Sequence, residues 1–304
     1  MKLNNLVQKA ADKNRFIKLQ NYIDFSLLFL EYIDKNKQAD IISQNENKYK
    51  FFQFNKEAHF KVTRPYNSDL LFIPNLAEED FKSFKTIITH IKEDKDEAII
   101  EDRSIINNAI YSIQQSIGFA LDAGTAMGVE PNTARKINGD LFERLIQIIL
   151  QDIGLNCKSG VISIPVKVDG EALFKMNYQH DLIIEDDQQN LKIIGSVKTT
   201  SKDRIDKIFI DKFLYSKLTE TAIPHIAIFL HDVQRKKTKR ENEFGINTTF
   251  LSGHFKGYTI KLNPLDGVYY FDLRPNMIND KLLSKHIQPF DFLICEDIWK
   301  LLND

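Results

Sequence analysis

The sequence predicts an α/β fold in which helices flank a mixed central sheet, with a mainly helical subdomain before it. Two observations predict this fold: the helical spacing of apolar residues near 142–153, and the order of the elements that follow. A second helix is expected over about 203–218. The short apolar runs expected to form strands are 161–168, 181–184, 191–197 and 226–230. Helix, strands, helix and strand in this order are typical of an α/β domain with a mixed sheet.

The first helix of this region is expected to begin at Asn138 or Asp140, either of which can cap it, and to end at Gly154. A polar lead-in is expected at 133–138. The apolar residues that form the buried stripe of the helix are Phe142, Leu145, Ile146, Ile149, Leu150 and Ile153.

Residues 1–130 are expected to form the mainly helical subdomain, and residues 131–304 the α/β domain. Between them, Gly124, Gly128 and Pro131 interrupt the periodicity. The helices expected in the subdomain are 25–33, 81–91 and 105–120, with a hairpin at 48–62 and a loop at 67–76. Further strands are expected at 248–251, 258–262 and 268–272, and residues 290–302 close the chain as a strand or a helix.

The composition sets limits on the class of protein. Of the 304 residues, 43% are hydrophobic, which is enough for a real core. The net charge of −1 gives no overall basic signature for nucleic acid, so any such binding must depend on local charge. Cys157 and Cys295 are expected to be buried, reduced thiols, because no zinc or disulfide spacing exists. No signal peptide or run of ~20 apolar residues is present, so we expect a cytoplasmic protein without a membrane span.

One carboxylate and one lysine are expected at the same end of a β-hairpin. Asp181 opens one apolar run, a polar turn follows, and the next run ends at Lys198. Taken alone, each is more often a turn or surface residue. Together they suit a nuclease that uses Mg²⁺, because the carboxylate can hold the cation while the lysine acts near the attacked phosphate.

Two further acids are candidates for the same cation. Glu143 lies at the edge of the apolar stripe of its helix, where a half-buried carboxylate must be paired, protonated or bound to a cation. A salt bridge, for instance to Arg144, is the competing interpretation. Asp211 lies 13 residues after Lys198, on the next expected helix and on the same face as Arg204. Asp206 is the alternative to Asp211.

These residues resemble the PD-(D/E)xK superfamily of nucleases, and more narrowly its type II restriction endonucleases. One branch of that family carries S-x-K, with the displaced acid on the following helix. This chain has Ser196-Val197-Lys198 and then Asp211. It departs from the family pattern in two places: His180 precedes Asp181 where proline is nominal, and Asp211 stands where glutamate is usual.

The same branch carries a K-T-T-x-(K/R)-(D/E)-R pattern, and residues 198–204 of this chain read K-T-T-S-K-D-R. The resemblance implies that Lys202, Asp203 and Arg204 read a CC/GG core. Basic side chains can donate to guanine O6 and N7, and an aspartate can accept from cytosine N4. Without the resemblance, the triplet would be interpreted as a solvated, self-paired start of a helix.

The resemblance implies a Mg²⁺-dependent enzyme that cuts both strands of DNA and leaves 5′-phosphates. Its cation would be held by Asp181, Glu143 and Asp211, with Lys198 beside the attacking water. It also implies a homodimer on palindromic double-stranded DNA, and a cognate DNA methyltransferase as a functional partner. The N-terminal subdomain would clamp DNA or form the dimer, with 25–29 as a candidate surface.

Basic residues that could touch phosphates, or could simply be solvated, are Arg135, Lys136, Arg235, Lys236, Lys237, Lys239 and Arg240. His225, His231 and His254 show no metal spacing and are expected to be structural. Two other functions remain open. One is a repair or structure-specific nuclease of the same fold, and the other is a DNA-binding protein with a decayed site, which Ser196 and the shorter Asp211 would explain.

Overall fold

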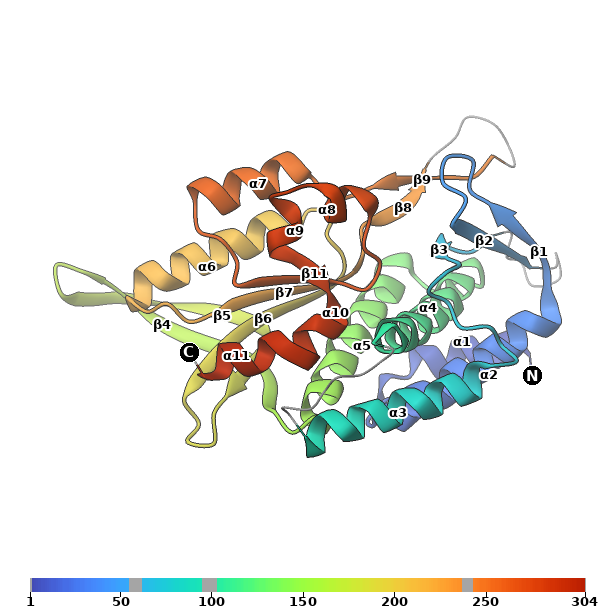
Figure 1. Cartoon of the computed structure of the whole chain (residues 1–304), viewed down its shortest axis with the longest axis horizontal. Helices are drawn as coiled ribbons and strands as arrows, with labels where there is room; N and C mark the ends of the chain where they lie inside the picture. Colours follow the sequence, from blue (N-terminus) through green and yellow to red (C-terminus); the bar gives the residue numbers. More distant parts are fainter. Residues whose placement is uncertain (1, 55–61, 95–102, 237–242, 304) are drawn as a thin grey trace. The chain divides into compact units, whose positions relative to one another are not determined.

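The computed structural model of the chain describes residues 2–54, 62–94, 103–236 and 243–303. These residues form two compact units (Figure 1). The first unit contains Met1–Thr89, Ile99–Ile148 and Asp232–Thr249, and the second contains His90–Ala98, Ile149–His231 and Phe250–Asp304. This division follows contacts between residues, and it assigns a late segment of the sequence to the first unit. In the described part of the chain, no helix combines the length and the apolar character needed to cross a membrane.

The first unit is built mainly from helices. They are α1 (Leu3–Ala11), α2 (Leu19–Asn36), most of α3 (Ala77–Glu93), α4 (Ser104–Ala126) and the larger part of α5 (Pro131–Asp152), with a short 3₁₀ turn at Lys13–Arg15. Helix α4 contacts both α1 and α2, and its residues are buried on nearly every side. The expectation that 25–29 forms a dimer or DNA surface is wrong, because Phe25 and Phe29 are 4% and 0% exposed and belong to this core.

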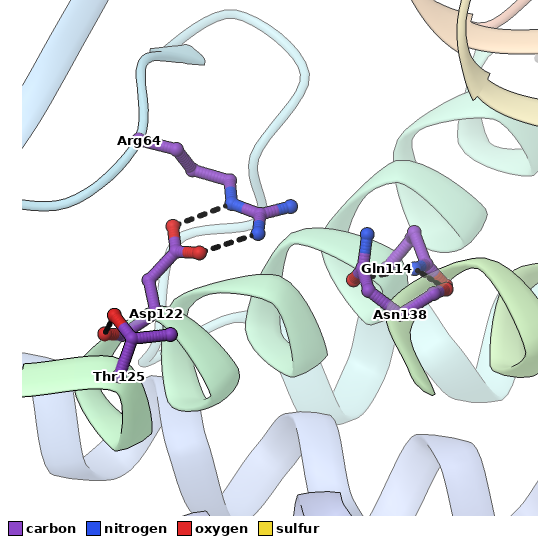
Figure 2. A network of polar contacts seen from close by, with 5 residues as sticks. All are labelled: Arg64, Gln114, Asp122, Thr125 and Asn138. Atoms are coloured by element: carbon purple, nitrogen blue, oxygen red, sulfur yellow. Dashed lines mark hydrogen bonds and ion pairs between the residues drawn. The ribbon is translucent and has the colours of Figure 1, made fainter. Parts of the chain in front are cut away.

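Figure 2 shows polar contacts that fix α4 inside this unit. The guanidinium of Arg64 donates through Nε and Nη2 to the two carboxylate oxygens of Asp122, each at 2.7 Å. Gly118 leaves room for this guanidinium, since a Cβ there would lie 2.4 Å from Nη1 of Arg64. The buried side chain of Gln114 donates to the backbone carbonyl and side-chain oxygen of Asn138 at 3.0 and 2.9 Å. These bonds join α4 to α5 and to the segment before β3.

Two small antiparallel sheets complete the first unit. One has the order β1 (Lys37–Ile42), β2 (Tyr49–Phe54) and β3 (Tyr66–Asn67), and the other pairs β8 (Val233–Lys236) with β9 (Gly245–Thr248). The first strand of the hairpin predicted at 48–62 is present as β2. It pairs with β1 and β3. Residues 55–61 lie outside the described residues.

Helix α5 begins at Pro131, seven residues before the predicted start at Asn138. The polar segment at 133–138 is helical because Glu130 acts as its cap. The Glu130 carboxylate accepts the backbone N–H groups of residues 132 and 133 at 2.6 and 3.2 Å. Proline is favoured at the first helical position, where its missing N–H costs nothing. The predicted end is confirmed: Gly154 has φ +95° and stops the helix.

The second unit has a mixed sheet, as predicted, and it contains six strands. Its order is β11 (Ile287–Pro289), β10 (Gly267–Tyr270), β7 (His225–His231), β6 (Leu191–Thr200), β5 (Glu171–Glu185) and β4 (Asn156–Val168). Strands β4, β5 and β6 pair antiparallel, whereas β6, β7, β10 and β11 run parallel. The two buried cysteines are free thiols, as expected.

Strand β5 is much longer than the predicted run at 181–184. A two-residue turn at Asp169 and Gly170, with φ values of +53° and +88°, joins it to β4 in a long hairpin (Figure 1). Asp181 therefore lies inside a strand and does not open one, which corrects the prediction.

Helices cover both faces of this sheet (Figure 1). On one face, α6 (Ile205–Thr219) and α7 (Ser252–Lys261) pack on β7 and β10 through a core that includes Phe209, Phe255 and Tyr270. On the other face, Tyr269 donates a hydrogen bond to Asp297 in the C-terminal helical segment. The remaining helices are α8 (Pro275–Asn279), α9 (Leu283–His286), α10 (Phe290–Phe292), a π turn at Leu293–Asp297 and α11 (Ile298–Asn303). Residues 290–302 are thus helical, and the strand predicted at 258–262 is wrong because most of it is the end of α7.

Candidate active site

The sheet brings Asp181 and Lys198 together, as the sequence predicted. Nζ of Lys198 donates to Oδ2 of Asp181 at 2.6 Å, and the backbone N–H of Val197 donates to the same oxygen at 2.8 Å. The two side chains are only 12% and 28% exposed. Both contacts fall on Oδ2, and Oδ1 accepts no hydrogen bond within the described ranges of the chain. One oxygen of a half-buried carboxylate is thus left for another partner.

A β-bulge aims Asp181 at this position. On β4 the pairing residues Lys158 and Gly160 are two apart, but their partners on β5, Ile183 and His180, are three apart. The extra residue falls at Asp181 and Leu182. A bulge of this kind redirects a side chain, and such bulges are frequent beside active sites. Because of it, Asp181 does not follow the simple alternation of β5 and can reach the amide and the lysine of β6.

The pair lies on the face of the sheet that α6 covers. Lys198 and Ile194 are four residues apart on an unbroken stretch of β6, so they share a face. Ile194 packs in one cluster with Tyr178 of β5 and Tyr215 of α6. Asp211, also on α6, is therefore on the same side of the sheet as Lys198.

His180 interacts electrostatically with both Asp211 and Asp181. From the sequence it was recognised only as a departure from the family pattern, and no role at the site was expected for it. Burial lowers the pKa of His180, while the nearby carboxylates of Asp211 and Asp181 raise it and Lys207 lowers it. Both acids therefore act on one buried imidazole. Burial also raises the pKa of Tyr178, and Asp211 raises it further. The Nε2 atom of His180 is buried and has no hydrogen-bond partner among the residues described.

Asp211 and Asp206 have different partners. Asp211 is ion-paired with Lys207 one turn earlier in α6, and its side chain is 24% exposed. Asp206 lies in the first turn of α6, with Oδ2 at 3.5 Å from Nδ1 of His254. Asp211 raises the pKa of His180, the residue before Asp181, whereas Asp206 is not among the groups that shift this pKa.

Glu143 lies in α5, within the first unit, between the buried Phe142 and the partly buried Arg144. Its own side chain is partly buried, as expected for the edge of the apolar stripe. Arg144 donates to the backbone carbonyl of Lys13 at 2.7 Å. The expected meeting of Glu143 with Asp181 stays a prediction.

Lys202, Asp203 and Arg204 form an exposed turn between β6 and α6. The helix begins at Ile205, so the triplet precedes it. Asp203 has φ +53°, a left-handed conformation that is uncommon for a residue other than glycine. The backbone N–H of Lys202 donates to Oγ1 of Thr200 at 3.2 Å, and that of Arg204 to the carbonyl of Ser201 at 3.2 Å. Three neighbouring side chains are thereby presented to solvent on a defined turn.

The remaining predicted residues are distributed as follows. His225 and His231 are buried, whereas His254 has a side chain that is 57% exposed and lies 3.5 Å from Asp206. Four basic residues are exposed, namely Arg135, Lys136, Arg235 and Lys236. Lys237, Lys239 and Arg240 lie outside the described residues.

The carboxylate oxygens of Asp181 and Asp211 are chemically suitable ligands for Mg²⁺, because hard oxygen atoms are its usual protein ligands. Among the residues that the structure describes, no three histidine, cysteine or acidic side chains lie together as a ready-made metal site. Mg²⁺ is commonly held by one or two carboxylates together with water and substrate phosphates, so a full protein cage is not needed. The available Oδ1 of Asp181 fits that mode of binding.

No protein-family model and no curated protein sequence matches the chain. Among solved structures, the crystal structure of the type IIP restriction endonuclease Kpn2I resembles it with a TM-score of 0.72 and 15% identity. The likeness covers 99% of this chain and 97% of that one. The chain has the fold of a restriction endonuclease. A complex of the restriction endonuclease PspGI with substrate DNA is also similar, with a TM-score of 0.43 and 14% identity over 74% of this chain and 91% of that one.

The carboxylate of Asp181 lies at a bulge in one central strand and Lys198 lies in the next strand, 2.6 Å away. Such a pair can hold a cation and a water molecule beside a phosphate.

Proposed function

We propose that the protein is a type II restriction endonuclease that cuts both strands of DNA at a palindromic site with a CC/GG core. The observation that carries this proposal is the contact between Asp181 and Lys198 on adjacent strands of a restriction-endonuclease fold. The products would be a 5′-phosphate and a 3′-hydroxyl on each strand.

Lys198 would hold the attacking water and favour loss of its proton. Its ammonium group is partly buried and is held by Oδ2 of Asp181, so its position is defined before DNA binds. Positioning of this kind lowers a barrier, because a nucleophile already aligned with the phosphorus avoids an entropic cost. The bulge at Asp181 and the amide of Val197 keep the carboxylate beside Lys198.

Asp181 and Asp211, with Glu143 from α5, would hold Mg²⁺. The bound ion would stabilise negative charge on the phosphate during cleavage. Asp211 would have to exchange its ion pair with Lys207 for this role. That exchange is inexpensive, because an exposed pair one helical turn apart contributes only ~0.3–0.5 kcal/mol. Ser196 lacks the charge of the acid that usually stands there, and Asp211 on the same face of the sheet would compensate for it.

The turn at 202–204 would read the bases. Lys202 and Arg204 would donate to guanines and Asp203 would accept from cytosine N4, in the major groove. Their exposure and the backbone bonds that define the turn support this role. A palindromic site has two-fold symmetry, so the active species would be a homodimer. A cognate DNA methyltransferase would protect the host DNA.

Digestion of plasmid DNA with and without Mg²⁺ tests the proposal. Discrete fragments that appear only with the metal are expected, and run-off sequencing of their ends would give the site. Ragged or structure-limited cutting would favour a repair-type nuclease of the same fold. Retarded but intact DNA would favour a DNA-binding protein with a decayed site.

Two lysine variants sharpen the test, because the chain offers a matched control. Lys198→Ala is expected to abolish cleavage while leaving binding largely intact. Lys158 is also ion-paired with an acid of β5, at 2.6 Å from Glu185, but it is 54% exposed and lies on the edge strand. Lys158→Ala should therefore cleave like the wild type. Undiminished cleavage by Lys198→Ala would remove Lys198 from the mechanism.

A further inference from the structure

The hairpin of β4 and β5 continues past the helix that covers its base (Figure 1). On β4, Ile162 and Ile164 are two residues apart, and their partners on β5 are Tyr178 and Met176. These four side chains therefore share one face of the hairpin. They belong to one apolar cluster with Tyr215 of α6. The base of the hairpin thus has an apolar face that α6 covers.

The same face of the hairpin is exposed nearer its turn. By the two-residue alternation, Val166 and Val168 of β4 and Phe174 of β5 lie on the face that α6 covers further back. Val168 and Phe174 are 52% and 57% exposed. Leu173, the extra residue of a bulge opposite Val166 and Lys167, is 64% exposed. We refer to Val168, Leu173 and Phe174 as the hairpin patch.

The two faces of the hairpin differ in chemical character. The face opposite the apolar one is polar, with Ser163 hydrogen-bonded to Asn177 across the strands and with Lys175 exposed. A two-stranded ribbon is at best marginally stable by itself in water. Apolar side chains that are gathered on a surface and rimmed by polar ones mark sites of interaction. The contrast between the faces indicates that a partner covers the apolar side of the tip.

The charges around the hairpin patch suit a second copy of the chain better than a nucleic acid. Lys167 and Lys175 are balanced by Asp169 and Glu171, so the tip has no net charge. None of these four side chains forms an ion pair within the described part of the chain. A DNA-binding surface requires an excess of positive charge. A surface with equal numbers of both signs can complement itself, because a two-fold contact places the same surface on both sides.

The sequence of β4 opposes contact through the edge of the sheet. This strand is the outer one, so its free backbone groups could pair with another chain. It contains Pro165, which lacks an N–H group, and two exposed lysines, Lys158 and Lys167. Proline and lysine are the residues that keep an edge strand from pairing. A partner is therefore expected on the apolar face of the tip and not as an added strand.

We propose that the hairpin patch is the surface on which a second copy of this chain docks, with the two tips packed face to face about a two-fold axis. The choice of a second copy rests on the proposed function, which requires a homodimer on palindromic DNA. Residues 25–29, first expected to form the dimer, belong to a core, so another surface is needed. Three side chains cover less than the ~800 Å² per partner of a standard interface, so the dimer should dissociate on dilution.

Sedimentation velocity at a series of protein concentrations, without DNA, measures the dissociation constant of the dimer. Phe174→Asp should raise this constant by at least about tenfold, because it places a charge in the centre of an apolar contact. Ile260→Asp is the matched control, since Ile260 is 61% exposed and lies on α7, outside the hairpin. It should dimerise like the wild type. A wild type that is monomeric at every concentration, or equal constants for Phe174→Asp and the wild type, would overturn the inference.

Energy transfer between labelled copies gives a second, independent measurement. Both native cysteines are buried, so Lys175→Cys supplies an exposed thiol beside the patch for a donor or an acceptor dye. Mixed copies should show transfer that excess unlabelled protein removes, and dyes at Ile260→Cys should transfer less. Equal or greater transfer at Ile260→Cys would overturn the inference. A wild type that dimerises through the patch but neither binds nor cuts DNA would instead overturn the proposed function.

Discussion

Lys212 is predicted to be the main polar anchor of α6, the helix that carries Asp211 and follows the 202–204 turn. Its ammonium group donates to the carbonyl of Pro264 at 2.6 Å and to Oδ2 of Asp266 at 2.7 Å. The same carboxylate oxygen accepts the backbone N–H of His225 at 2.6 Å, at the start of β7. The side chain of Lys212 is only 9% exposed.

The expected cost of Lys212→Met follows from these contacts. Breaking a fully buried ion pair costs ~3–5 kcal/mol, and a hydrogen bond to a charged group contributes ~1.5–3 kcal/mol. Asp266 is 30% exposed and keeps the N–H of His225, so its carboxylate can recover solvation. We therefore expect the free energy of unfolding to fall by about 2 kcal/mol.

The same helix supplies a matched control. Lys207 is also paired with an acid, Asp211, but it is 68% exposed, and a pair of this kind contributes ~0.3–0.5 kcal/mol. Lys207→Met makes the same chemical change five residues away. Urea unfolding of both variants should give a difference of at least about 1 kcal/mol in the free energy of unfolding.

A double-mutant cycle with Asp266→Asn completes the assay. The two residues are in direct contact, so a coupling energy of about 1 kcal/mol or more is expected between Lys212→Met and Asp266→Asn. Equal stabilities for the Lys212→Met and Lys207→Met proteins, or additive effects in the cycle, would refute the anchoring role.

Three further outcomes test the structure. Asp122→Ala leaves the Arg64 guanidinium half-buried and without its carboxylate partner, so calorimetry should show a loss of about 2 kcal/mol in the free energy of unfolding. A change below about 0.5 kcal/mol, as for an ordinary surface substitution, would contradict this. Glu130→Ala removes the cap of α5 and should cost ~1 kcal/mol in urea unfolding, whereas an unchanged midpoint would show that Pro131 suffices. Burial lowers the pKa of His225 to about 4, so the folded protein binds its proton less readily than the unfolded chain, and stability falls as pH falls from 6.5 to 4. His225→Phe should remove ~3 kcal/mol of that loss, measured by urea unfolding at several pH values, and an equally steep dependence in the variant would rule out His225 as its source.

The sheet was predictable where apolar residues form unbroken runs. The run at 191–197 is buried between two strands and became β6. Most of β5 was missed because residues 171–179 extend into a largely exposed hairpin, where no core imposes an apolar pattern. The turn itself was readable, since Asp169-Gly170 is a strong hairpin signal.

The error at 258–262 has a different origin. Alternating Tyr258, Ile260 and Leu262 suggest a strand, but Ile260 is 61% exposed. The packing that decides the element occurs at helical spacing: Phe255 and Tyr258 both contact Phe209. Tertiary contacts with α6 selected the helical period over the local β propensity of the segment.

For the candidate site, the sequence was sufficient to bring Asp181 and Lys198 together but not to explain how. Two apolar runs joined by a turn form a hairpin, so the start of the first run and the end of the second lie side by side whether or not one strand contains a bulge. The bulge itself depends on the pairing of β5 with β4, which no local pattern announces. His180 was missed for the same reason, because its closeness to Asp211 exists only after α6 has folded onto the sheet.

Helix α6 connects the features that the proposed chemistry needs. Its first turn follows the 202–204 turn and contacts His254 through Asp206, and its middle carries Asp211. Lys212 ties that middle to the segment before β10 and, through Asp266, to the start of β7. A shift of the helix would therefore displace the 202–204 turn and Asp211 together. If recognition and cleavage are coupled through this element, Lys212→Met should lower cleavage of cognate DNA more than it lowers affinity, while Lys207→Met should not. A parallel loss of binding and cleavage in Lys212→Met would instead show that α6 acts only as part of the stable core.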